Sequence, residues 1–98
     1  MPETGVDAFI RERDRCVDRL RGMPLTRLPQ SADLAYETAG ALVGLTYGAA
    51  GHPLPRLADH AAGDQLAVVA ADLLAGDPDA DTLDRATAVL SELRRSLP

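Results

Sequence analysis

The sequence predicts an all-α protein, a single small antiparallel four-helix bundle. Apolar residues recur every three or four positions, and glycine and proline cluster between these periodic stretches. No stretch alternates with period two, and aromatic residues make up only 3% of the chain, which disfavours strands. With 98 residues, 46% of them hydrophobic, the chain can bury one modest core, so one helical domain is expected over residues 1–98. The expected helices cover about residues 6–21, 32–50, 55–75 and 82–96.

The first two helices are predicted from their apolar spacing and their end signals. Asp7 in the first turn and Gly22 after the last suit the helix at 6–21. Pro24 and Pro29 should keep the following connector out of helix. Ser31 is a suitable N-cap for the second helix, which runs to about residue 50.

The last two helices follow from the remaining breaks in the chain. The Gly-His-Pro-Leu-Pro segment at 51–55 interrupts the second helix, and Pro55 suits the first turn of a third, which Gly76 ends. Asp81 is expected to cap the fourth helix, with Asp77 and Asp79 in the turn before it. Those acids match the start of an EF-hand loop, but the glycine and the last glutamate of that motif are missing, so helix capping is favoured.

Composition favours a cytoplasmic protein of a GC-rich bacterium, such as an actinobacterium. All ten basic residues are arginine, and alanine, glycine and proline are abundant, as GC-rich codons dictate. The N-terminus is acidic before any apolar run, unlike a secretory signal, and Cys16 has no second cysteine to bond. The most apolar stretch, 34–50, contains Glu37, so no membrane span is expected.

The net charge of −5 is unevenly distributed along this acidic chain. Residues 1–28 hold six arginines against five acids, whereas residues 29–98 hold four against ten. Arg11, Arg15 and Arg19 form a ladder at helical spacing that could dock an acidic partner. Acids interleave with this ladder and no aromatics accompany it, which argues against nucleic-acid binding.

Three glycines at i, i+4 and i+8 form the most informative pattern. Gly40, Gly44 and Gly48 would each cost up to about 1 kcal/mol relative to alanine inside a helix. A glycine stripe lets another group approach the helix backbone closely. We expect helix three or four to pack on it within the monomer; a partner or dimer contact and a small ligand are the alternatives.

Single residues suggest further, weaker candidates. His52, Asp59, His60 and Asp64 could supply metal ligands, although an exposed His60–Asp64 ion pair is the simpler interpretation. Cys16 lies at the border of the apolar stripe and is expected to be structural. Arg13 lies within that stripe, so it is expected to pair with an acid, Glu37 being the first candidate; a ligand-anchoring arginine is the alternative.

The sequence predicts function only by class. No catalytic triad, phosphate loop, zinc motif or dinucleotide fingerprint is present, so neither catalysis nor a cofactor is expected. The favoured hypothesis is a helical-bundle adaptor, accessory subunit or regulator that contacts another protein or a second copy of itself. The alternative is a bundle that binds a metal or small ligand around His52 and His60.

Overall fold

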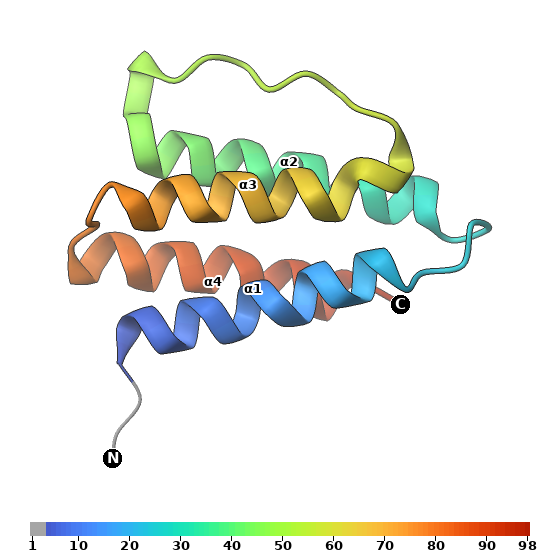
Figure 1. Cartoon of the computed structure of the whole chain (residues 1–98), viewed down its shortest axis with the longest axis horizontal. Coiled ribbons are helices and arrows are strands. Elements are labelled where there is room, and N and C mark those ends of the chain that lie inside the picture. The colour runs from blue at the N-terminus through green and yellow to red at the C-terminus, as the bar shows by residue number, and fades with distance from the viewer. Residues whose placement is uncertain (1–3) are drawn as a thin grey trace.

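The computed structural model describes residues 4–98 and confirms an all-α four-helix bundle (Figure 1). Its α-helices are α1 (Gly5–Arg21), α2 (Leu28–Tyr47), α3 (Ala62–Ala75) and α4 (Ala80–Ser96). Two short 3-10 helices, η1 (Gly48–Ala50) and η2 (Asp59–Ala61), flank the long connection between α2 and α3.

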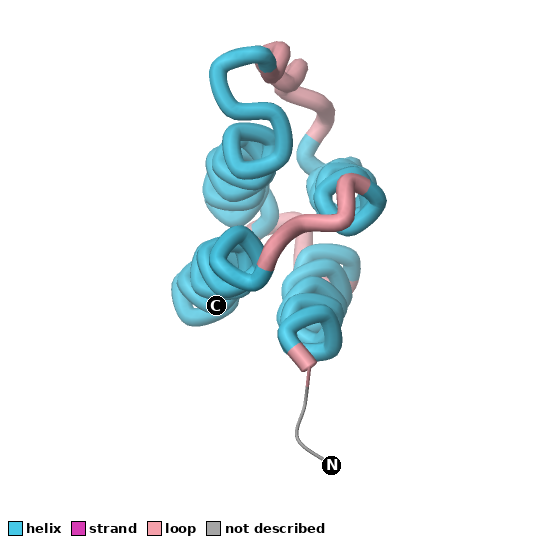
Figure 2. The backbone as a smooth tube through the Cα atoms, turned by 90° about the vertical axis from the view of Figure 1, so that its left-hand side faces the viewer, coloured by secondary structure: helices cyan, strands magenta, loops and turns pink. Residues whose placement is uncertain are grey.

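Each helix contacts two neighbours and faces the fourth across the core. Seen along the bundle, α1 packs against α3 and α4, α2 packs against the same two helices, and α1 lies diagonally opposite α2 (Figure 2). The core between them is filled mainly by leucine and one phenylalanine. Its largest fully buried side chains are Phe9, Leu42, Leu66, Leu73, Leu90 and Cys16.

The helix directions differ from the predicted antiparallel bundle. Tyr47, at the end of α2, donates a 2.7 Å hydrogen bond to Asp72 near the end of α3, so these two helices run in parallel. The first and last helices are parallel as well: Gly5 lies against Leu83 at their starts, and Arg19 bonds the Leu97 carbonyl at their ends. The two parallel pairs run in opposite directions to each other (Figure 1).

Residues 51–58, here called the crossover loop, cause this arrangement. They return along the bundle in irregular conformation, so α3 starts beside the start of α2 (Figure 1). The prediction that Pro55 begins the third helix is wrong, because α3 starts only at Ala62. Two prolines in this loop have no N–H to donate to a backbone hydrogen bond. Side chains of the bundle hold the loop in its extended course instead.

Side chains of α2 and α3 bind the crossover loop directly. Tyr36 donates to the Leu54 carbonyl at 2.5 Å, and Gln65 donates to the Pro55 carbonyl at 3.0 Å. Arg56 bridges Asp33 and Asp59 at 2.7 and 2.9 Å, with its guanidinium 5.9 Å from the Tyr36 ring centre. These contacts replace the hydrogen bonds that an early helical turn would have made.

Helix ends explain the other differences from prediction. The second helix begins at Leu28, because Pro29 fits its first turn, where a missing N–H costs nothing. Ser31 is therefore a buried residue inside α2 and not its N-cap. In α4 the N-cap is Asp79, which accepts from the Thr82 N–H at 2.8 Å; Asp81 lies inside the helix and pairs with Arg85.

One partly buried ion pair connects the parallel first and last helices. Arg94 of α4 donates from two nitrogens to the carboxylate of Glu12 in α1, at 2.7 and 3.2 Å. The Glu12 side chain is only 12% exposed. The hydrogen bond from Arg94 lowers the pKa of Glu12 below its ordinary value, so folding is linked to ionisation of this carboxyl.

We predict that Glu12→Gln lowers the free energy of unfolding at pH 7 by about 1–2 kcal/mol, because a charged hydrogen-bonded pair is lost. The folded pKa is depressed, so this stabilisation is present above the unfolded value of about 4.3 and is lost as the pH falls through the folded pKa. Urea unfolding at several pH values should show the wild-type and variant curves converging in acid. Glu92→Gln, which removes an exposed pair with Arg95, is the control and should change little.

Candidate interaction surface

The outer face of α2 carries two glycines that the monomer leaves uncovered. Gly40 and Gly44 are exposed, and beyond their own helix no atom of residues 4–98 lies within 4 Å of where a Cβ would stand. The expectation that helix three or four packs on this stripe within the monomer is therefore wrong. The reason is topological, because both neighbours of α2 contact its other sides.

Gly48, the third glycine, has a different explanation. Its φ is +59°, a conformation that side-chain-bearing residues rarely adopt, and it forms the C-cap of α2. Its backbone conformation therefore requires glycine, whatever lies outside. Of these three glycines, Gly40 and Gly44 are the two positions where the described residues leave room for alanine.

Small side chains extend this uncovered face along the second half of α2. Glu37, Ala41 and Gly44 are exposed and share the face with Gly40 and Gly48 at helical spacing. Between Glu37 and Tyr47, which is half-exposed at the edge of the face, these positions carry no side chain larger than a methyl group. We call residues 37, 40, 41, 44 and 48 the flat face of α2.

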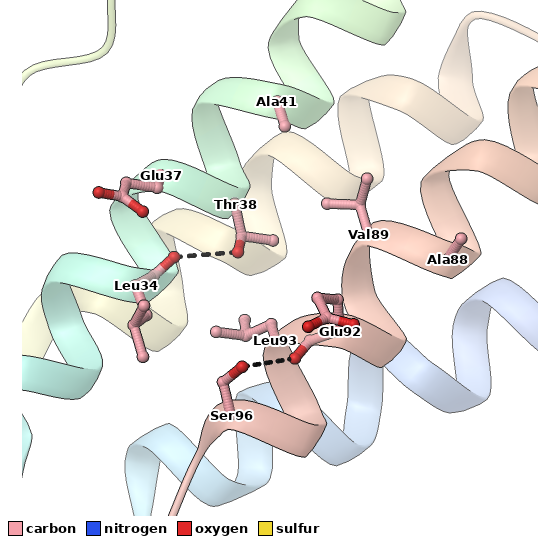
Figure 3. A pocket seen from close by; sticks show the side chains of 9 residues that line it. All are labelled: Leu34, Glu37, Thr38, Ala41, Ala88, Val89, Glu92, Leu93 and Ser96. Atoms are coloured by element: carbon pink, nitrogen blue, oxygen red, sulfur yellow. Dashed lines mark hydrogen bonds between the residues drawn. The ribbon is translucent and has the colours of Figure 1, made fainter.

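A groove between α2 and α4 borders the flat face (Figure 3). It has a volume of about 430 Å3, and side chains from both helices line it: Leu34, Glu37, Thr38, Ala41, Ala88, Val89, Glu92, Leu93 and Ser96. The hydroxyls of Thr38 and Ser96 donate to backbone carbonyls of their own helices, at 2.9 Å each. The groove floor is therefore mostly apolar, with carboxylates at its margins.

A second hollow lies on the other side of the flat face, beneath the crossover loop. It measures about 260 Å3, and the glycines of α2 and the loop line it: Gly40, Val43, Gly44, Gly48, Gly51, His52, Pro53 and Leu54. Gly51 is required here, because a Cβ would approach the Val43 side chain to 2.9 Å. The structure thus places His52, a candidate metal ligand, beside the glycine stripe.

The candidate metal ligands are engaged elsewhere or lie apart. Asp59 accepts from Arg56, and Asp64 accepts from Arg21 at 2.6 Å instead of pairing with His60. His60 lies in η2, before the helix in which the i, i+4 pair was expected. Within residues 4–98 no three or more His, Cys, Asp or Glu side chains are grouped as metal ligands.

The arginine ladder lies on α1, the helix diagonally opposite the flat face. Arg11, Arg15 and Arg19 are all exposed. Arg19 donates to the backbone oxygens of Leu97 and Pro98. Arg15 and Arg19 also line a hollow of about 480 Å3 with Asp18 and Arg94. Because of this diagonal placement, the ladder and the glycines belong to separate surfaces.

Arg13 and Glu37 do not form the pair that the sequence suggested. Arg13 hydrogen-bonds Asp14, its neighbour in the chain, at 2.9 Å with its side chain 26% exposed. Glu37 is exposed on α2, which lies diagonally opposite α1. Arg13 therefore leaves the apolar stripe at the bundle edge and needs no partner across the core.

Cys16 is a core residue. Its side chain is fully buried, and the thiol donates to the Leu90 carbonyl at 3.2 Å. Burial raises the pKa of this thiol to about 11, so the nucleophilic thiolate is scarce near neutral pH. The structural role expected for Cys16 agrees with this environment.

Comparison with protein-family models, curated proteins and solved structures finds no match for this chain. In the described part of the chain, no helix combines the length and apolar character needed to cross a membrane. Function must therefore be inferred from the chain's own surfaces.

The α2–α4 groove was not predicted from the sequence. Ala88 of α4 is exposed and lines this groove. The apolar residues Leu34 and Val89 line the groove walls, and each is only partly buried. Which helix lies beside α2 depends on the crossover, and no local pattern encodes that.

Replacing the glycines of α2 should change the free energy of unfolding of the monomer. Gly40→Ala and Gly44→Ala should each raise the free energy of unfolding by about 0.5–1 kcal/mol, because alanine is the better helix former and space is open. Gly48→Ala should lower it by about 1 kcal/mol or more, because φ is positive there. Urea unfolding of the dilute monomer measures all three. A destabilised Gly44→Ala would show that the glycine serves the monomer.

The buried thiol of Cys16 should react slowly in the folded protein. In native buffer at pH 8, Cys16 should react with an aromatic disulfide reagent orders of magnitude more slowly than in 6 M guanidinium chloride, because only opened molecules expose it. The absorbance of the released thiolate measures the rate. Equal rates in the two solvents would contradict the buried position.

Proposed function

We propose that this chain functions by protein–protein contact through the flat face of α2, as an adaptor, accessory subunit or regulator without a catalytic step. The contact is with another protein or with a second copy of the chain. The single cysteine, which has no second cysteine to bond, supports a cytoplasmic setting, and the composition supports a GC-rich bacterium.

The energetic cost of Gly40 and Gly44 is the observation that supports this proposal. Together they cost up to about 2 kcal/mol relative to alanine, a sizeable fraction of a small domain's stability. The described residues gain no close packing from them, because beyond their own helix none of their atoms lies within 4 Å of a Cβ built at either position. A partner helix lying on the flat face would gain close backbone approach, and alanine methyl groups at these positions would hold it further away.

The arginine ladder supplies a second, separate docking surface in this proposal. Arg15 and Arg19 share a hollow with Arg94, although Arg94 is neutralised by Glu12 and Arg19 is bound by the end of α4. An acidic segment could add to this side of the bundle. The ladder contributes less than the flat face, because its exposed charges are screened by salt.

Gly44→Leu tests the proposal, because beyond its own helix no atom of residues 4–98 lies within 4 Å of an added Cβ in the monomer, whereas a docked helix would clash with the leucine side chain. Light scattering after size exclusion at several concentrations tests self-association, and affinity capture from the native host tests a heterologous partner. We expect Gly44→Leu to fold and to reduce association or capture at least tenfold.

Ala71→Leu is the control, since it places the same leucine side chain at an exposed position on α3. It should leave association and capture unchanged. The proposal is overturned if the wild-type chain stays monomeric and if Gly44→Leu still captures every protein that the wild type captures.

A further inference from the structure

The α2–α4 groove combines an apolar floor with carboxylates that come from both walls. Glu37 projects from α2 and Glu92 from α4, and both line the same groove (Figure 3). We infer that this groove binds an amphipathic helix of another protein, which inserts a small apolar side chain and presents an arginine or lysine to Glu37 and Glu92. This inference rests on the proposed function and names its partner.

The shape of the groove suits a helix. Its walls are two antiparallel helices whose facing side chains are small near Ala41 and Ala88 and larger near Leu34 and Leu93. Both hydroxyls are bonded within their own helices, so the floor presents no unmet hydrogen-bonding group. Apolar side chains at i and i+3 or i+4 of a ligand helix match such a groove.

The charges of the groove specify the polar part of the ligand. Within residues 4–98, Glu37 is in no salt bridge, and Glu92 has only an exposed i, i+3 pair with Arg95 at 2.9 Å. Glu37 and Glu92 give the rim of this apolar groove negative charge, and a guanidinium or ammonium of the ligand complements that charge. The ligand is therefore basic on the edge of its apolar face.

Charge also argues against a second copy as the occupant. The chain carries −5, so two copies repel. Its arginine-rich helix, α1, directs its apolar side chains Phe9, Val17 and Leu20 into its own core. The outer side of α1 alternates Arg11 and Arg15 with Asp14 and Asp18 and offers no exposed apolar stripe to insert.

A displayed library of helical peptides, randomised at apolar and charged positions, tests the inference with the intact protein as bait. We expect enriched peptides to share small apolar residues at i and i+3 or i+4 with an arginine or lysine one turn away. Glu37→Arg should weaken the best peptide at least tenfold, and replacing its basic residue by glutamate should restore binding to that variant. Raising the salt concentration should weaken the wild-type complex.

A control variant on α1 and a groove variant on α4, outside the flat face, complete the test. Asp14→Asn, on the diagonally opposite α1, should bind the peptide as the wild type does. Ala88→Arg, which fills the groove from α4, should abolish binding while circular dichroism remains helical. If enriched peptides lack basic residues, or if they bind Glu37→Arg and Ala88→Arg unchanged, the groove inference fails.

Gly44→Leu distinguishes a failure of the groove inference from a failure of the proposed function. Binding that is lost in Gly44→Leu but unaffected by Glu37→Arg and Ala88→Arg retains the proposed function and rejects the groove. A library from which nothing is enriched above an unrelated acidic bait rejects the groove inference, and the native-host capture then decides the proposed function alone.

Discussion

The extended course of residues 51–58 determines which helices become neighbours. A helix starting at Pro55 would leave a short connector and place α3 antiparallel to α2. Instead, Arg56 is held by Asp33 and Asp59, and Tyr36 bonds the Leu54 carbonyl, so the chain travels back along α2 before α3 begins. The parallel α2–α3 pair, the antiparallel α2–α4 groove and the uncovered flat face all follow from this crossover.

The uncovered face is best understood as a conflict between local and global preferences. Elsewhere the chain satisfies its local rules: Thr4 and Asp7 form a capping box, Asp79 caps α4, and the buried side-chain polar atoms of the described residues all have partners. At Gly40 and Gly44 a poor helix former stands inside α2, and no other element of residues 4–98 packs against it. Such local inconsistencies concentrate where a protein has a task beyond folding.

Much of the fold could be predicted from the sequence because its signals are local. Helical spacing of apolar residues identified the four helices, and the ends at Arg21, Ala75 and Ser96 agree with the structure. The start of α2 was misplaced because Pro29 was taken for a breaker, although it fits a first turn. The start of α3 was misplaced for the converse reason, because Pro55 suits a first turn but its surroundings hold it in the loop.

The candidate surfaces could be predicted only in part. The glycine spacing was visible in the sequence, but whether another helix covers it depends on tertiary arrangement. The Arg13–Glu37 pair failed for the same reason, because it assumed that α1 and α2 are adjacent when they lie diagonally opposed. Facing residues such as Glu37 and Glu92 are brought together by helices far apart in the chain.

The parallel pairing of α1 with α4 has a consequence for synthesis on the ribosome. The thiol of Cys16 meets the carbonyl of Leu90, 74 residues later, and Glu12 meets Arg94 across 82 residues. The growing chain therefore cannot bury the apolar stripe of its first helix against the last until nearly the whole sequence has emerged. Until then Phe9 and Val17 lack the α4 half of their packing, so the earliest helix to be made is among the last to be fully enclosed.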